Sequence, residues 1–136
     1  VDHKDKDYFE EQIEKYKFVT YKGVAQQSDI PQILEKYDAM LFPTHYPTEG
    51  IPGSVIDAYI SGIPVIASDW TYARELIEDG KTGTIITFEN NQKEFISVCE
   101  EYLRNTEMLN SMKDNARVRA AEYHADNVKQ ILKKYF

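Results

Sequence analysis

Three short apolar stretches, separated by longer amphipathic segments, constrain the fold of this chain more than any other feature. They are AMLF at 39–42, PVIAS at 64–68 and GTIITF at 83–88, and each is short and rich in apolar or β-branched residues. Such stretches are typical of strands in a parallel sheet whose two faces are covered by helices. A fourth candidate strand is KFVTY at 17–21, which ends at Gly23.

The segments between and after these strands carry apolar residues at the spacing of amphipathic helices. The predicted helices cover residues 9–16, 28–37, 54–61, 72–78, about 91–104, about 107–122 and about 125–135. Gly62 and Pro64 are expected to stop the third of them. The alternation predicts a Rossmann-like α/β fold, a parallel sheet with helices on both faces that ends in a run of helices. The length of 136 residues suits one domain, so we expect a single domain over residues 1–136.

Charge and cysteine content exclude several classes of protein. The net charge is −7 and the isoelectric point is about 5.0, so the basic footprint of a nucleic-acid binder is missing and we expect no nucleic-acid partner. The single cysteine, Cys99, excludes a disulfide framework and a Cys-rich metal site, and its helical surroundings predict a small core residue. No run of about 18 apolar residues and no signal peptide is visible, so we expect a cytoplasmic protein.

The loop at 43–53 is the candidate binding site. It follows the strand at 39–42 and leads into the helix at 54–61, and ligands of open parallel sheets bind at the carboxyl ends of the strands. The first N–H groups of a helix lack helical partners and carry a partial positive charge, which suits an anion such as phosphate. Gly50 and Gly53 have no side chain, so a ligand can approach the backbone closely.

Two carboxylates flank the end of this loop. Glu49 lies just before the Gly-Ile-Pro-Gly turn, and Asp57 lies eight residues later, inside the helix. A carboxylate at that depth can accept hydrogen bonds from a diol such as a ribose. We therefore predict a split site, in which backbone N–H groups bind phosphate or sugar oxygens and the two carboxylates bind hydroxyls. The structural alternative is that Ser54 and Asp57 form a capping box, with Glu49 a solvated loop residue.

The order of these motifs closely resembles the C-terminal, nucleotide-sugar-binding domain of the group 1 (family 4) retaining glycosyltransferases, which have the GT-B fold. The resemblance rests on FPT at 42–44, EGIPGSVIDAYISGIPVIASD at 49–69 and ARELIEDGKTG at 73–83. That family has a Glu-x7-Glu motif that starts in a Gly-rich loop and ends on the following helix. Glu49 and Asp57 occupy its two acidic positions.

The resemblance implies a role for each residue around the turn. Glu49 would be the catalytic residue that binds hydroxyls of the donor sugar, and Asp57 would bind the ribose. The remaining substrate-binding residues would be Gly50, Ile51, Pro52 and Gly53 in the turn that faces the sugar and phosphate, and Ser54 and Val55 near the diphosphate. Glu75 occupies a further acidic position, for which we expect a structural role.

Several positions depart from the family pattern. Asp57 stands where the family usually has Glu, Gly53 stands where many relatives have a bulkier residue, and His45 and Tyr46 lengthen the loop. The family also binds the diphosphate with an Arg and a Lys from the first strand-turn-helix of this domain, and nothing before residue 17 matches that element. We therefore expect an N-terminally truncated donor-binding domain whose partner is the acceptor-binding N-terminal domain of the same enzyme.

The implied reaction is transfer of a sugar from a nucleoside diphosphate sugar to an acceptor hydroxyl, with retention, in polysaccharide or glycoconjugate synthesis. No metal or other cofactor is implied, and the fragment alone is expected to be inactive. The alternatives are a sugar-nucleotide epimerase or phosphorylase on the same GT-B architecture, or a non-catalytic nucleotide-binding module.

The last predicted helix allows two interpretations. In the family it often returns to the N-terminal domain, which would make its apolar face a docking surface; otherwise that face packs on its own domain. The face comprises Val128, Ile131, Leu132 and Tyr135. The full-length enzyme is also a candidate for peripheral association with the inner face of the membrane.

Overall fold

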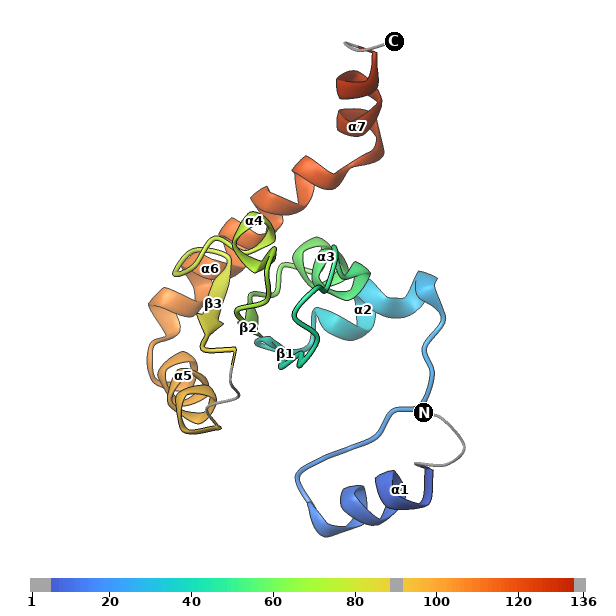
Figure 1. The fold of residues 1–136 in the computed structure, drawn as a ribbon, viewed down its shortest axis with the longest axis vertical. Coiled ribbons are helices and arrows are strands. Elements are labelled where there is room, and N and C mark those ends of the chain that lie inside the picture. Colours follow the sequence, from blue (N-terminus) through green and yellow to red (C-terminus); the bar gives the residue numbers. More distant parts are fainter. Residues whose placement is uncertain (1–5, 89–91, 134–136) are drawn as a thin grey trace.

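The centre of the protein is a three-stranded parallel sheet. A computed structural model describes residues 6–88 and 92–133. The strands are β1 (Met40–Phe42), β2 (Val65–Ser68) and β3 (Gly83–Ile86), which lie side by side in the order β1-β2-β3 (Figure 1). In the register, Ile66 of β2 is paired with Leu41 on one side and with Thr84 on the other. The predicted α/β class and parallel sheet are therefore confirmed.

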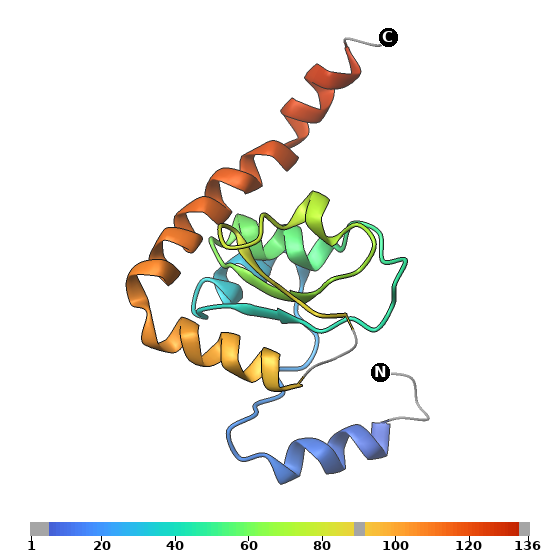
Figure 2. The same cartoon turned by 60° about the vertical axis from the view of Figure 1, so that its left-hand side comes forward.

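Helices connect the strands and follow them. α1 (Lys6–Lys15), the 3-10 turn η1 (Gln27–Asp29) and α2 (Ile30–Leu34) precede β1; α3 (Gly53–Ile60) joins β1 to β2, and α4 (Ala73–Leu76) joins β2 to β3. After β3 come α5 (Gln92–Arg104), α6 (Thr106–Ala120), the 3-10 turn η2 (Ala121–Tyr123) and α7 (Ala125–Leu132). The predicted run of C-terminal helices is confirmed, and Figure 2 shows α6, η2 and α7 following one another until α7 projects away from the sheet.

The docking face predicted for the last helix lies outside the described side chains. Those of Val128, Ile131 and Leu132 are not described, and Tyr135 lies beyond the described residues. The two interpretations of that face therefore stay open.

The middle strand determines the layered arrangement. All four residues of β2 are buried, and successive side chains point to opposite faces of the sheet. Val65 and Ala67 enter a core shared with α3, α4 and α6, while Ile66 enters a second core shared with α5 and α6. Apolar side chains on both faces require helices on both faces, as the sequence predicts. Cys99 is half-buried against the second core, and this burial raises the pKa of its thiol.

The strand predicted at 17–21 is absent. These residues are irregular, and every residue from Glu14 to Asp29 is exposed, with Phe18 at 86%. A strand needs a neighbour to pair its N–H and C=O groups, and within the described ranges no other strand lies beside this segment. A ring contact joins Tyr21 of this segment to Phe9 of α1, with centroids 5.1 Å apart.

The end of α3 follows the predicted glycine stop. Gly62 adopts a φ of 69°, a left-handed conformation that glycine tolerates best. Its N–H donates to the carbonyl of Tyr59, and the N–H of Ile63 donates to the carbonyl of Ala58. These two bonds satisfy the last carbonyls of the helix and turn the chain into β2.

Tyr59 links α3 to two points of the connection between β2 and β3. Its side chain is fully buried, its hydroxyl donates to the carbonyl of Leu76 at 3.3 Å, and it shares a hydrogen bond of 3.0 Å with the Thr82 hydroxyl. Thr82 in turn accepts a hydrogen bond from the N–H of Glu78. Burial raises the pKa of Tyr59 from 10.0 to about 12.

Tyr59→Phe is expected to lower the free energy of unfolding by about 1 kcal/mol at neutral pH, through loss of the buried hydrogen bonds. This difference should shrink as the pH rises from 10.0 towards about 12, because the native protein keeps the phenol protonated while the unfolded chain has lost its proton. Urea unfolding across this pH range measures the effect. Tyr8→Phe, at a position that is 66% exposed, is the control and should be neutral. A difference that stays constant across the range would contradict the prediction.

Candidate functional site

The loop between β1 and α3 is anchored to the next crossover of the sheet. It leaves the carboxyl end of β1 at Pro43. The carbonyl of Pro47 accepts two hydrogen bonds from Thr71, one from its N–H at 3.0 Å and one from its hydroxyl at 2.7 Å. Thr71 follows the carboxyl end of β2, so the loops after these two strands are joined. The loop therefore has a defined path along the edge of the sheet where a parallel fold binds its ligands.

Glu49 lies at the end of this loop and is half-buried. Its carboxylate accepts a hydrogen bond of 3.4 Å from the Thr44 hydroxyl, and its N–H donates to the carbonyl of Tyr46. Thr44 also accepts a hydrogen bond from the N–H of Tyr46, so one hydroxyl organises both ends of the turn. Glu49 is thus held by its own loop, which differs from the solvated loop residue of the structural alternative.

The helix that follows begins one residue earlier than predicted. Pro52 is the N-cap, with an extended backbone and no side-chain capping bond, and Gly53 is the first helical residue. Ser54 is therefore the second residue of α3 and Asp57 the fifth. The capping-box interpretation of these two residues is wrong, because Pro52 takes the capping position and Ser54 is already inside the helix.

The start of α3 faces solvent. Gly53 and Ser54 are exposed, whereas Val55 is fully buried and its N–H donates to the carbonyl of Pro52. The first N–H groups of a helix have no partners in the helix, and these two lie where a ligand can reach them. A Cβ added to Gly50 or Gly53 would meet no atom within 4 Å, so open space adjoins both glycines.

Asp57 lies one turn further along α3. Residues four apart in a helix lie on the same face, so Asp57 lies behind the exposed Gly53. The residue is half-buried, and among the described residues its carboxylate has no hydrogen-bond or ion-pair partner. A half-buried carboxylate without an internal partner is available to a ligand that offers hydroxyl groups.

Sequence reasoning missed a pocket beside the loop. Its volume is about 170 Å³, and it is lined by Gly50, Ile51, Tyr72, Glu75, Leu76 and Tyr123. These residues come from three segments far apart in the chain, so no local pattern could have indicated them. Glu75 thus lines the same pocket as Gly50 and Ile51 of the turn.

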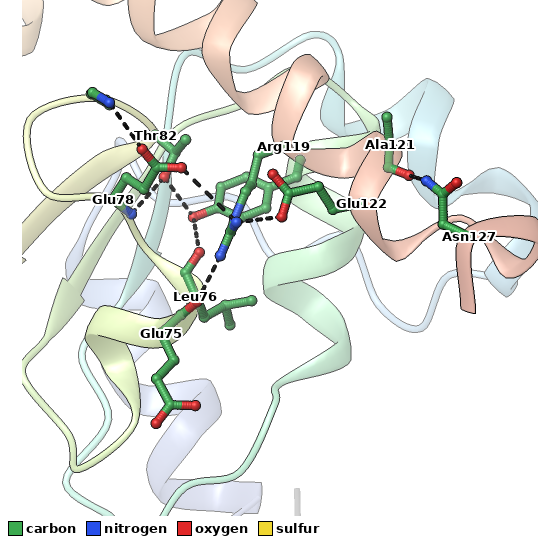
Figure 3. Close-up of polar contacts among 10 residues, drawn as sticks. Glu75, Leu76, Glu78, Thr82, Arg119, Ala121, Glu122 and Asn127 are labelled. Carbon is green, nitrogen blue, oxygen red and sulfur yellow. Dashed lines mark hydrogen bonds and ion pairs between the residues drawn. The ribbon is translucent and has the colours of Figure 1, made fainter. Parts of the chain in front are cut away.

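Arg119 of α6 holds α4 beside this pocket (Figure 3). Its side chain is only 17% exposed, and it donates to the carbonyl of Glu75 at 2.6 Å. It also pairs with Glu122 at 2.5 Å and, more distantly, with Glu78 at 3.9 Å. Its guanidinium stands 5.6 Å from the ring centroid of Tyr123. The contact of Arg119 with Glu75 is to the backbone carbonyl, and the carboxylate of Glu75 points away from Arg119. The structural role expected for the acidic side chain therefore stays a prediction.

The described residues hold no group of three or more His, Cys, Asp or Glu side chains that could bind a metal ion. None of the helices within the described ranges is long and apolar enough to cross a bilayer.

A family model for group 1 glycosyl transferases matches residues 2–119. The chain belongs to the group 1 glycosyl transferases. The resemblance stated from the sequence is therefore confirmed at the level of the family. The roles assigned to Glu49, to Asp57 and to the residues between them stay predictions.

Two curated relatives and one solved structure are similar to this group 1 chain. An uncharacterised 41.2 kDa protein in the cps region of Klebsiella pneumoniae is 32% identical over 61% of this chain and 22% of its own length. WcaL of Salmonella typhimurium, assigned provisionally as a colanic acid biosynthesis glycosyltransferase, is 28% identical over 81% of this chain and 29% of its own length. The crystal structure of HepE from Anabaena in complex with UDP-glucose superposes with a TM-score of 0.84 at 22% identity, over 99% of this chain and 37% of that one.

The structural similarity confirms the expected GT-B-type fold of this group 1 domain. The chain spans less than a third of the length of the curated relatives that it matches, 22% and 29%.

Asp57→Ala is expected to change the free energy of unfolding by less than about 0.5 kcal/mol, because the carboxylate caps nothing and has no described partner. Asn105→Ala is the matched control, since Asn105 is a true N-cap whose side chain accepts from the N–H of Met108 at 3.0 Å. That variant should lose about 1 kcal/mol in the same urea unfolding experiment. An equal loss of unfolding free energy in both variants would contradict this prediction and would mean that Asp57 stabilises the fold.

Proposed function

We propose that this chain is the donor-binding domain of a retaining glycosyltransferase, which transfers a sugar from a nucleoside diphosphate sugar to an acceptor hydroxyl. The observation that carries the proposal is the position of Glu49 and Asp57 on either side of an exposed helix start, at the carboxyl edge of a parallel sheet. Membership of the group 1 family supports the same chemistry. HepE, with a similar fold, has been crystallised with UDP-glucose.

In the proposed site, three kinds of group bind three different parts of the donor. The exposed N–H groups at Gly53 and Ser54 suit the diphosphate, because the start of a helix carries a partial positive charge. The Glu49 carboxylate, oriented by Thr44, suits hydroxyls of the sugar. Asp57, one turn deeper, suits the ribose diol. Since aspartate is one methylene shorter than the usual glutamate, its contact requires either a closer ribose or one bridging water.

The same groups would favour the reaction. The transition state of glycosyl transfer resembles an oxocarbenium ion, with positive charge on the sugar and growing negative charge on the leaving diphosphate. The start of α3 is aimed at the place where the negative charge develops, and it needs no reorganisation during the step. Glu49 would hold the sugar hydroxyls so that the anomeric carbon faces the acceptor.

We further propose that the chain works as part of a longer enzyme. The acceptor site lies on an N-terminal domain of the same protein, so the isolated chain binds the donor without turning it over. The relatives in a cps region and in colanic acid biosynthesis favour polysaccharide or glycoconjugate synthesis. Such an enzyme would work in the cytoplasm, with its membrane-bound form at the inner face.

Nuclear magnetic resonance titration tests donor binding directly. UDP, GDP, ADP and one UDP-sugar are added separately to the chain, and amide shifts are followed. One nucleotide is expected to shift residues 49–57 with a dissociation constant in the millimolar range or below, and Asp57→Ala should weaken binding by about tenfold through the lost charged hydrogen bonds. The control is Asp126→Ala, at an exposed carboxylate on α7. Shifts that spread elsewhere, or equal binding by both variants, would contradict the assigned site.

Chelation tests the proposal that no metal is needed. In the same titration, EDTA is expected to leave the dissociation constant unchanged, because the proposed diphosphate ligands are backbone N–H groups. A binding signal that EDTA abolishes and Mg²⁺ or Mn²⁺ restores would sink this part of the proposal.

A further inference from the structure

The pocket beside the turn is too small for a whole donor. It is the pocket of about 170 Å³ that the turn shares with α4, and we call it the Glu75 pocket. Pockets that enclose a complete drug-sized ligand measure about 300–1,000 Å³. Two of its lining residues, Gly50 and Ile51, belong to the turn to which the proposed function assigns the sugar. The Glu75 pocket therefore suits one substituent of a sugar that is bound at the turn.

The lining of the Glu75 pocket is mostly apolar and contains one charged residue. Ile51 and Leu76 are aliphatic, and Tyr72 and Tyr123 are aromatic residues with one hydroxyl each. Among the described residues that line the pocket, Glu75 is the charged one. A polar ligand group buried without a partner costs free energy, so the group that fits offers few polar atoms and some apolar surface.

The carboxylate of Glu75 is available to a ligand. Within the described ranges it has no hydrogen-bond or ion-pair partner, and Figure 3 shows it pointing away from Arg119. Arg119 contacts the backbone carbonyl of Glu75 instead, and the neighbouring Arg74 pairs with Asp69 at 2.8 Å. Because neither guanidinium neutralises this carboxylate, it attracts hydrogen-bond donors and repels anionic groups.

Two sets of contacts hold the walls of the pocket in place. Thr71 donates two hydrogen bonds to the carbonyl of Pro47, which tie the segment after β2 to the loop that carries the turn. Arg119 donates to the carbonyl of Glu75 at 2.6 Å, and its guanidinium stands 5.6 Å from the ring centroid of Tyr123. A pocket whose walls are fixed before binding loses less entropy when a ligand enters.

Four kinds of sugar substituent can be compared with this lining. A carboxylate is repelled by Glu75. A hydroxyl-bearing edge of a sugar brings several polar groups, most of which an apolar lining leaves unpaired. An ammonium brings three donors to a single carboxylate and has no apolar surface. An acetamido group brings one N–H donor, one carbonyl and one methyl group, which matches a carboxylate beside a phenol and aliphatic side chains.

We propose that the Glu75 pocket binds the 2-acetamido group of an N-acetylated donor sugar. Glu75 accepts a hydrogen bond from the amide N–H, the Tyr72 hydroxyl donates to the amide carbonyl, and the methyl group contacts Ile51 and Leu76. The inference rests on the proposed function, because the turn must first hold the sugar. It gives the side chain of Glu75 a part in selecting the sugar, whereas Glu49 and Asp57 bind groups that all donors share.

Titration of the full chain with matched donors tests the inference. The probes are UDP and two pairs of donors, UDP-glucose with UDP-N-acetylglucosamine and UDP-galactose with UDP-N-acetylgalactosamine. Within a pair, the two donors differ only in an acetamido group that replaces a hydroxyl. In at least one pair, the N-acetylated donor is expected to bind about tenfold more tightly, because it gains a hydrogen bond to a charged group.

Variants of Glu75 assign this preference to the pocket. Glu75→Ala is expected to weaken binding of the N-acetylated donor about tenfold and to change the binding of UDP and of the hydroxyl counterpart less than about twofold. Glu75→Gln keeps an acceptor oxygen without the charge, so it should lose only about threefold. The control is Glu101→Ala, at an exposed glutamate on α5, which packs on the opposite face of the sheet from α4 and should bind every probe like the unmodified chain.

Two outcomes would overturn the inference while UDP still shifts residues 49–57. One is equal affinity for both members of each pair, and the other is a Glu75→Ala variant that weakens both members alike. In either case the proposed function stands and the Glu75 pocket does not select the sugar. A chain that binds neither UDP nor any of the four donors would contradict the proposed function for uridine donors, and the inference would fail with it.

Discussion

The pairing of β2 between β1 and β3 is the constraint on which the rest of the structure depends. Because β2 is buried along its length, its side chains need a helical layer on each face, and α3, α4, α5 and α6 supply these layers. Because all three strands are parallel, the loops after β1 and β2 emerge at the same edge. The hydrogen bonds from Thr71 to Pro47 join those loops and fix the approach to α3. The candidate site is thus a direct consequence of the sheet.

Much of the fold could be predicted because its signals are local. The buried strands are apolar runs, and the end of α3 is marked by a glycine in a left-handed conformation. The strand expected at 17–21 could not be judged in this way, because a strand exists only with a partner and pairing is not a local property. The start of α3 differs by one residue from the prediction because serine is the commoner N-cap, whereas here Pro52 takes that position.

The candidate site, like the fold, could be predicted from the sequence only in part. Glu49 and Asp57 could be named from their position around a turn, and the structure adds that Thr44 orients the first while the second has no partner among the described residues. The pocket at Gly50 could not be predicted, since its lining comes from three segments far apart in the chain. The hydrogen bond from Arg119 to Glu75 could not be predicted either, since it joins α6 to α4 across 44 positions of sequence. Arg119 connects α4, beside the candidate site, to α6, which is followed by η2 and α7.

The most direct test of the central claim, that Glu49 and Asp57 bind the donor, is a crystal structure of the protein with the nucleoside diphosphate sugar it prefers. The account predicts the diphosphate at the exposed start of α3, with Glu49 within about 3 Å of a sugar hydroxyl. It predicts Asp57 at the same distance from a ribose hydroxyl or from a single water that bridges to it. A donor bound away from this edge of the sheet, or one that leaves both carboxylates in solvent, would contradict the account.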